Sequence, residues 1–202
     1  MRNEDKNFLY EKNLFVIKSN KKAPLSDGDN EYAVQDRAYS YITNFTGAID
    51  IGARFGGWAR NMQKKFQKLY CFEPREKWLY LLEKNIKLDN VVIYPYGIGE
   101  SEHYCNMQGN RIIEKSVEKT SMIVKTLDSF NFKDISFIKI DTDGYELNVL
   151  QGGVKTLLEN KPIVCMEYVP RLPYDGEKAY RYILDLGFKE LETIGLNKIY
   201  SY

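Results

Sequence analysis

The sequence predicts an α/β fold whose core is a doubly wound, mostly parallel, seven-stranded sheet ending in an antiparallel hairpin. Short apolar runs alternate with segments whose apolar residues recur every three to four positions, which is typical of strands and helices alternating along a parallel sheet. The last two apolar runs are joined through a glycine, which favours a hairpin. With 202 residues, 44% of them hydrophobic and 28% charged, the chain has the size and composition of a single globular domain spanning 1–202.

The first half of the core contains three predicted strands, at residues 47–51, 68–72 and 91–96. Between the first two, Trp58, Met62 and Phe66 recur at intervals of four and predict a helix with one buried face. The segment after the second strand carries a similar apolar face and is also expected to be helical. This half therefore consists of two successive strand–helix units that lead into a third strand.

The second half begins with a less regular stretch, residues 100–134. We expect a hairpin or flap there, with strands at 102–107 and 121–127 separated by the polar segment 108–119. The parallel pattern then resumes, with strands at 135–141 and 163–168, a helix over 146–160 that Gly152 and Gly153 break or kink, another helix near 179–186, and final strands at 188–191 and 197–202.

Residues 1–46 precede the core 47–202 and are expected to form an extension with a hairpin at 13–22 and a helix at 31–45. The charged start lacks the apolar centre of a secretory signal, and no apolar run reaches the roughly 20 residues that span a bilayer, so we expect a cytoplasmic protein without a membrane partner. With 29 basic and 28 acidic side chains, no nucleic-acid partner is expected. The oligomeric state stays open. The three widely spaced cysteines predict buried thiols and no metal site.

The turn after the first strand contains Asp50, Gly52 and Gly56. Ligands of open α/β sheets bind beyond the carboxyl ends of the strands, and glycines let backbone amides approach them closely. An acid two residues before the first glycine suits a cationic ligand such as S-adenosylmethionine, whose amino-acid end Asp50 is expected to hold directly or through water. The spacing G-x-x-x-G-G is a poor match to the dinucleotide pattern G-x-G-x-x-G. An ordinary turn without a ligand is the alternative.

Glu73 follows the second strand directly and offers two acceptor oxygens for the hydroxyls of a ribose. Adenosylmethionine and nicotinamide cofactors both contain that ribose, so this residue does not distinguish them. Pro74 is expected to form one wall of the adenine site. A solvated strand-end carboxylate is the competing interpretation.

Three carboxylates, Asp141, Asp143 and Glu146, lie at the carboxyl end of the fourth predicted parallel strand, and Lys139 shares a strand face with Asp141. Such a cluster can orient an acceptor hydroxyl and take its proton. It can also bind a divalent metal or cap the next helix. Glu167, at the end of the fifth strand, is expected to face the same crevice, where burial would raise the pKa of one carboxyl.

Taken together, these motifs resemble the FkbM family of S-adenosylmethionine-dependent methyltransferases. The matching segments are D50-I-G-A-R-F-G56, F72-E-P74, G97-I-G99, T126-L-D128 and K139-I-D-T-D-G-Y-E-L-N-V-L-Q-G152, followed by Pro162 and Glu167. Arg54 stands where the family usually has Asn, and Asp143 where it has Glu.

The resemblance implies the Rossmann-like class I methyltransferase fold, adenosylmethionine as methyl donor, and O-methylation of a sugar or small-molecule hydroxyl. It implies a catalytic role for Asp141, which also faces the cofactor, and the position of Glu167 at the end of the fifth strand makes it the second expected catalytic residue. The expected cofactor contacts are Asp50, Gly52, Ala53, Arg54, Phe55, Gly56, Glu73, Pro74, Gly97 and Ile98.

Two other functions stay open at this point: a nicotinamide-dependent oxidoreductase, and a binding or assembly protein that keeps the fold without turnover. The acceptor is expected to be a small molecule or a glycan. His103, the only histidine, is a further candidate for the acceptor side.

Overall fold

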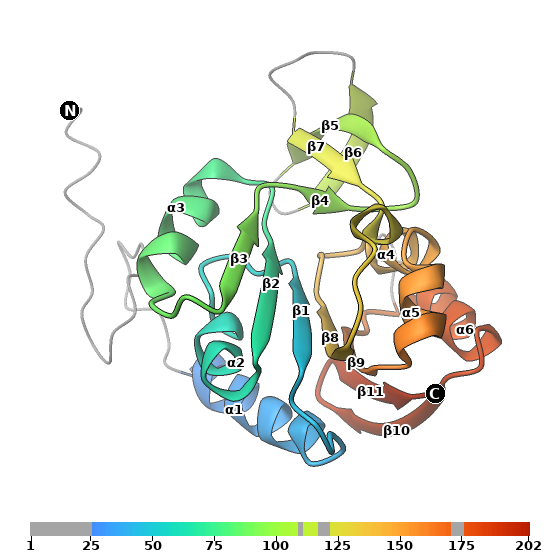
Figure 1. Ribbon diagram of the computed structural model, residues 1–202. Helices are drawn as coiled ribbons and strands as arrows, with labels where there is room; N and C mark the ends of the chain where they lie inside the picture. Colours follow the sequence, from blue (N-terminus) through green and yellow to red (C-terminus); the bar gives the residue numbers. More distant parts are fainter. Residues whose placement is uncertain (1–25, 109–110, 117–121, 171–175) are drawn as a thin grey trace.

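The computed structural model describes residues 26–108, 111–116, 122–170 and 176–202. Its main sheet contains β1 (Gly47–Ile51), β2 (Lys68–Phe72), β3 (Val91–Tyr94), β8 (Ile135–Ile140), β9 (Ile163–Glu167), β10 (Lys189–Ile194) and β11 (Asn197–Ser201). The strand order is β10-β11-β9-β8-β1-β2-β3 (Figure 1). The five strands from β3 to β9 run parallel, whereas β11 pairs antiparallel with both β9 and β10. The predicted fold class is thereby confirmed.

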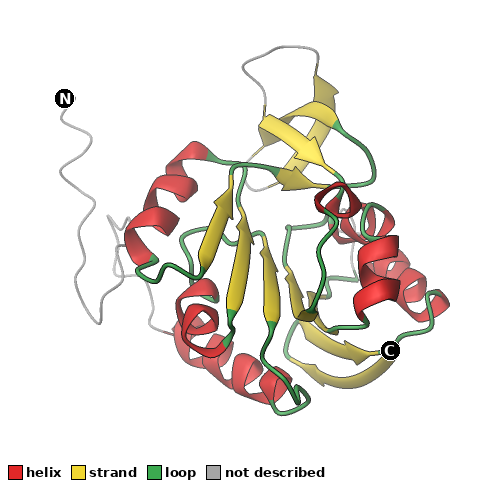
Figure 2. Ribbon diagram, in the orientation of Figure 1, coloured by secondary structure: helices red, strands yellow, loops and turns green. Residues whose placement is uncertain are grey.

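Helices cover both faces of this sheet (Figure 2). They are α1 (Ser26–Tyr39), α2 (Ala59–Lys65), α3 (Glu76–Asn85), α4 (Glu146–Gln151), α5 (Val154–Asn160) and α6 (Gly176–Asp185). Side chains alternate along each strand, so Ala48 and Phe137 pack with α1, α2 and α3, whereas Ile49 and Ile138 pack with α4, α5 and α6. The core is therefore two apolar layers separated by the sheet.

The predicted hairpin or flap of residues 100–134 is in fact part of a second sheet. This sheet contains β4 (Gly97–Ile98), β5 (His103–Gln108), β6 (Arg111–Ser116) and β7 (Met122–Lys125), in the order β4-β7-β5-β6. The interpretation of 108–119 as a polar connection was wrong, because β6 lies within it and pairs antiparallel with β5. Backbone pairing with a neighbour outweighs the weak strand preference of the segment. β3 also ends at Tyr94, two residues early, because Pro95 has no N–H to donate.

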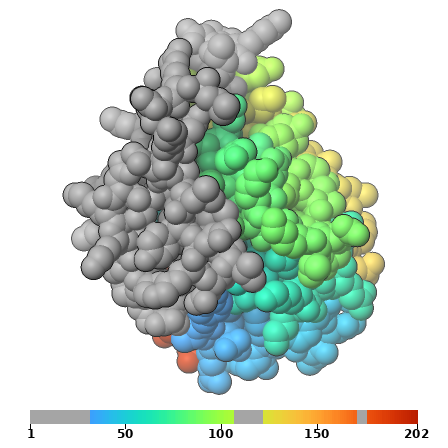
Figure 3. All heavy atoms as spheres, turned by 90° about the vertical axis from the view of Figure 1, so that its left-hand side faces the viewer, coloured from blue at the N-terminus to red at the C-terminus, as the bar shows by residue number. Residues whose placement is uncertain are grey.

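The helix expected at 31–45 begins and ends earlier, at Ser26–Tyr39. Beyond it, the Ser40 hydroxyl donates to the carbonyl of Arg37 at 2.7 Å, a local bond of the kind that competes with helix continuation. In the space-filling view of Figure 3, the blue residues of this part of the chain lie below the teal and green residues that follow them in the sequence. The hairpin expected at 13–22 lies outside the described residues.

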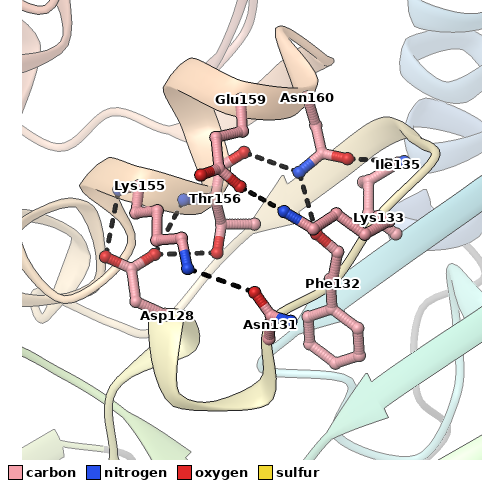
Figure 4. A network of polar contacts seen from close by, with 9 residues as sticks. All are labelled: Asp128, Asn131, Phe132, Lys133, Ile135, Lys155, Thr156, Glu159 and Asn160. Atoms are coloured by element: carbon pink, nitrogen blue, oxygen red, sulfur yellow. Dashed lines mark hydrogen bonds and ion pairs between the residues drawn. The ribbon is translucent and has the colours of Figure 1, made fainter.

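The segment T126-L-D128 positions α5 (Figure 4). Asp128 belongs to the 3-10 turn η2 (Leu127–Phe130), and its carboxylate accepts hydrogen bonds from the backbone N–H groups of Lys155 at 3.0 Å and Thr156 at 2.8 Å. These N–H groups belong to the first turn of α5, where they have no partner within the helix. Asp128 thus caps α5 from another element. Gly152 and Gly153 interrupt the helix and separate α4 from α5, as predicted.

The three cysteines are buried free thiols, as expected. Within the described ranges, no helix has both the length and the apolar character needed to cross a membrane.

Candidate functional site

A cavity of about 620 Å³ lies at the carboxyl ends of β1, β2, β8 and β9, in the volume range of small-molecule sites. The lining includes Asp50, Gly52, Ala53, Arg54, Phe55, Glu73, Pro74, Gly97, Ile98, Asp141 and Glu167. These are the residues selected from the sequence, with the exception of Gly56, which does not line it. The fold brings them together because the carboxyl ends of neighbouring parallel strands meet at one edge of a sheet.

The turn after β1 has a backbone that favours glycine. Gly52 has φ +83° and Gly56 has φ +92°, values in the left-handed region that side chains with a Cβ disfavour. A Cβ on Gly52 would lie only 1.9 Å from the carbonyl oxygen of Asp141. This glycine therefore lets the end of β1 approach the end of β8, and both ends line the cavity.

Glu73 is almost fully buried, with 3% of its surface exposed. Its Oε2 accepts a hydrogen bond from the backbone N–H of Arg54 at 3.0 Å, and its Oε1 accepts one from the backbone N–H of Arg75 at 2.9 Å. Burial raises the pKa of this carboxyl, although these bonds and the Arg75 guanidinium act in the opposite direction. Each oxygen retains acceptor capacity for one further donor.

Positive charge gathers beside Glu73. The guanidinium of Arg54 lies 5.0 Å from the ring centre of Trp78, and that of Arg75 lies 5.4 Å from the same ring. Both arginines line the cavity. Arg54 adopts φ 51°, so this non-glycine residue continues the left-handed conformation of the turn.

The opposite part of the cavity is acidic. On β8, Lys139 is buried, and its Nζ lies 3.0 Å from Oδ2 of Asp141 and 3.8 Å from Oδ1 of Asp50. Asp50 has no exposed surface, whereas 36% of the Asp141 side chain is exposed. Asp143, with φ 55°, adds another carboxylate to the lining.

Glu146 organises the turn between β8 and α4. Its Oε1 accepts hydrogen bonds from the backbone N–H and the hydroxyl of Thr142, both at 2.9 Å, and from the backbone N–H of Gly144 at 3.1 Å. The side chain is buried and does not line the cavity. These donors precede α4, whose N-cap residue Tyr145 makes no side-chain hydrogen bond. Glu146 therefore fixes the turn before the helix and does not cap it, while Asp141 and Asp143 line the cavity.

Glu167 ends β9 and faces the same space. Burial, together with the negative charges of Asp141, Glu146 and Asp143, raises its pKa to about 8. The carboxyl is therefore mainly protonated at neutral pH, so that it can donate a hydrogen bond to a ligand.

Several lining residues were not selected from the sequence. The turn between β10 and β11 contributes Ile194, Gly195, Leu196 and Asn197, and α1 contributes Ala33 and Val34. The glycine predicted the hairpin, but only the position of β11 beside β9 brings its tip to the cavity. His103 is not among the lining residues, and its Nδ1 lies 2.8 Å from the carbonyl oxygen of Ser101.

No cluster of three or more His, Cys, Asp or Glu side chains suited to a metal ion occurs in the ranges that the structure describes.

Comparison with known proteins identifies the domain. Residues 50–190 match the family model "Methyltransferase FkbM domain". No curated protein sequence gives a significant match.

Solved structures share the fold. An FkbM methyltransferase from Methylobacillus flagellatus is 21% identical over 86% of this chain, with a TM-score of 0.59, and the chain spans only 50% of that protein's length. A precorrin 8W decarboxylase from Methanobacterium thermoautotrophicum is 14% identical, with a TM-score of 0.56, and 98% of each chain is covered. A precorrin-6Y C5,15-methyltransferase from Geobacter metallireducens is 12% identical over 98% of this chain and 95% of that chain, with a TM-score of 0.55.

Proposed function

This chain belongs to the FkbM methyltransferase family, and from that premise we propose that it transfers the methyl group of S-adenosylmethionine to a hydroxyl of a sugar or other small molecule. The observation that carries the proposal is the cavity at the carboxyl ends of the parallel strands, with its two chemically different parts. Glu73 and the turn after β1 form one part, and Asp141, Asp143 and Glu167 form the other.

The residues present fit this cofactor. The two oxygens of Glu73 each accept one backbone hydrogen bond and can accept another, which suits the two hydroxyls of a ribose. Pro74 and Ile98 line the cavity beside it and offer apolar surface to an adenine ring. The carboxylates at the other end complement a sulfonium and an ammonium group.

The bound cofactor would supply an electrophilic methyl group on a sulfonium. The chain would align an acceptor oxygen with that methyl carbon and receive the proton released from the hydroxyl. Asp141, a partly exposed carboxylate, is the proton acceptor that we propose. Glu167, protonated at neutral pH, would donate a hydrogen bond that orients the acceptor.

We propose that the acceptor binds between Glu167 and the tip of the β10–β11 hairpin. There, Leu196 offers an exposed apolar side chain and Asn197 an amide. An apolar surface beside hydrogen-bonding groups suits a sugar or another small hydroxyl compound.

The test is a calorimetric titration of the whole chain with S-adenosylmethionine, S-adenosylhomocysteine and NAD in parallel. Saturable binding of both adenosyl compounds, without binding of NAD, is expected and would justify an acceptor screen with labelled methyl donor. Binding of NAD alone, or of none of the three, would contradict the proposal.

A further inference from the structure

Lys139 occupies an unusual position for a lysine. Only 4% of its surface is exposed, and lysine is rarely buried unless it is paired. It lies on the central strand β8, directly across the parallel ladder from Asp50 on β1. Strand alternation places Lys139 and Asp141 on one face of β8, where Phe137 packs with α1, α2 and α3.

The ammonium group bridges two carboxylates that differ in exposure. Its Nζ lies 3.0 Å from Asp141 and 3.8 Å from Asp50, and 5.7 Å from the ring centre of Trp58. Asp50 is completely buried, while more than a third of the Asp141 side chain is accessible. Both residues line the cavity, but Asp50 has no exposed surface, so Asp141 is the more accessible of the two carboxylates to a ligand.

We infer that Lys139 is a positioning residue for the proposed methyl transfer, holding the Asp141 carboxylate at the cavity wall while Asp50 fixes Lys139 from behind. The inference rests on the proposed function. It gives Asp50 an indirect role, through Lys139, in place of direct contact with the cofactor. It also explains why a cationic side chain lies beside a site for a cationic ligand: the two carboxylates outnumber it, and one negative charge remains on the exposed member.

The other titratable groups around this bridge lie on the neighbouring elements. Burial raises the pKa of two thiols, Cys71 on β2 and Cys165 on β9, that of Cys165 to about 12. The positive charge of Lys139 acts in the opposite direction on both. Burial raises the pKa of the Tyr39 hydroxyl on α1 well above its usual value, and the negative charge of Asp50 adds to this effect. The charge of Lys139 also reaches Glu167 on β9 and partly offsets the rise in its pKa. The two thiols and the tyrosine are neutral near pH 7, so Asp50 and Asp141 are the carboxylates that pair with Lys139 at close range.

The test uses the double variant Asp50→Asn/Lys139→Met, which removes one charge of each sign and leaves the net charge unchanged. S-adenosylmethionine and S-adenosylhomocysteine differ by a positive charge at sulfur, so the ratio of their dissociation constants reports the negative charge near the methyl group. We expect the affinity for S-adenosylhomocysteine to stay within about threefold and the preference for S-adenosylmethionine to fall about tenfold, because the carboxylate is no longer held. Near-ultraviolet circular dichroism and the Tm establish that the variant is folded.

A cycle with Asp141→Asn separates positioning from mere structural support. If Lys139 acts through Asp141, Asp141→Asn alone gives the same tenfold loss, and adding it to the double variant changes the ratio by less than about twofold. The control is Glu190→Gln/Lys198→Met, which removes another ion pair with a largely buried lysine, 2.9 Å long and outside the cavity lining. This control should keep the wild-type ratio.

An unchanged ratio in the folded double variant, or additive effects in the cycle, would overturn the inference while leaving the proposed function intact. Failure of the wild-type chain to bind either adenosyl compound would instead contradict the proposed function, and the inference with it. If Asp50→Asn/Lys139→Met does not fold, Asp50→Asn/Lys139→Gln retains polar groups in the same space and is read by the same criteria.

Discussion

Glu73 and Glu167 lie at the ends of two parallel strands, and burial raises the pKa of both carboxyls, but their neighbours differ. Glu73 has backbone N–H donors on both oxygens. Glu167 is close to three other carboxylates, which disfavour its ionisation. Residue type alone therefore does not assign the chemistry of these positions, whereas their neighbours do.

Replacing Glu73 with Gln should weaken binding of S-adenosylmethionine and S-adenosylhomocysteine equally, by about tenfold or more. The variant exchanges one acceptor oxygen for an NH₂ group that faces backbone N–H donors, and a hydrogen bond to a charged group contributes about 1.5–3 kcal/mol. Calorimetric titration measures both constants. Glu76→Gln, an exposed position on α3, is the control, and equal affinities in the two variants would contradict a ribose contact.

Glu167 should make the stability of the chain depend on pH. Its folded pKa of about 8 lies above the value near 4.3 expected for an unfolded chain, so the native state binds the extra proton between these limits. This stabilising contribution is complete below about pH 4.3 and is lost as pH rises through 8.

Urea denaturation of Glu167→Gln between pH 5 and 9 checks this dependence. The stability of the variant relative to wild type should increase with pH and level off above about pH 8. Glu190→Gln is the control, because hydrogen bonds from Thr193 and Lys198 lower the pKa of Glu190. The change in stability that this variant causes should therefore be constant between pH 5 and 9. A flat difference for Glu167→Gln would show that the carboxyl is ionised throughout.

At the scale of elements, the turn between β1 and α2 brings the end of β1 into contact with the end of β8, which is distant in sequence. Gly52 approaches the carbonyl of Asp141 so closely that no Cβ fits without a backbone shift. The turn thus sets the distance between the Glu73 part of the cavity and the Asp141 part.

Gly52→Ala should destabilise the chain by about 3 kcal/mol, because it combines overpacking against a backbone atom with a strained positive φ. Gly195→Ala is the matched control. It also has positive φ, 59°, but nothing lies within 4 Å of the added Cβ, so its cost should be only about 1 kcal/mol. Urea denaturation of both variants measures the difference, and equal losses would mean that backbone strain alone is responsible.

At the scale of the whole molecule, the layer between the sheet and α1–α2 is dominated by aromatic rings. Phe137 stacks on Trp58 and Phe66, with ring centres 6.2 and 5.8 Å away, and meets the edge of Tyr39 at 5.6 Å. This layer directly supports Lys139, two residues along the same strand. The stability of the core and the geometry of the acidic part of the cavity are therefore connected.

Phe137→Ala should lower the free energy of unfolding by about 3–5 kcal/mol, the typical loss for a buried aromatic residue. Tyr80→Ala, which removes an exposed aromatic ring on α3, should change it by no more than about 0.5 kcal/mol. Thermal and urea unfolding of the two variants provide the comparison. A small loss at Phe137 would indicate that the layer repacks around the deletion.

The sequence by itself determined the strands of the parallel core, the interruption of the helix at Gly152 and Gly153, and the residues at strand ends that line the cavity. These features depend on local signals: apolar periodicity, glycine turns, and the rule that parallel strands present their carboxyl ends at one edge. The same signals failed for β6, whose pairing depends on a neighbouring strand, and for the end of α1, where a serine hydroxyl competes for a carbonyl.

Only the tertiary structure decided which partners each polar residue of the site has. Sequence spacing placed Lys139 and Asp141 on one strand face, but the alignment of β8 with β1 brought Asp50 to the same ammonium group. The tip of the β10–β11 hairpin reaches the cavity because β11 pairs with β9. Burial, charge proximity and the partners of a carboxylate arise from contacts between segments distant along the chain, and local sequence patterns do not encode these contacts.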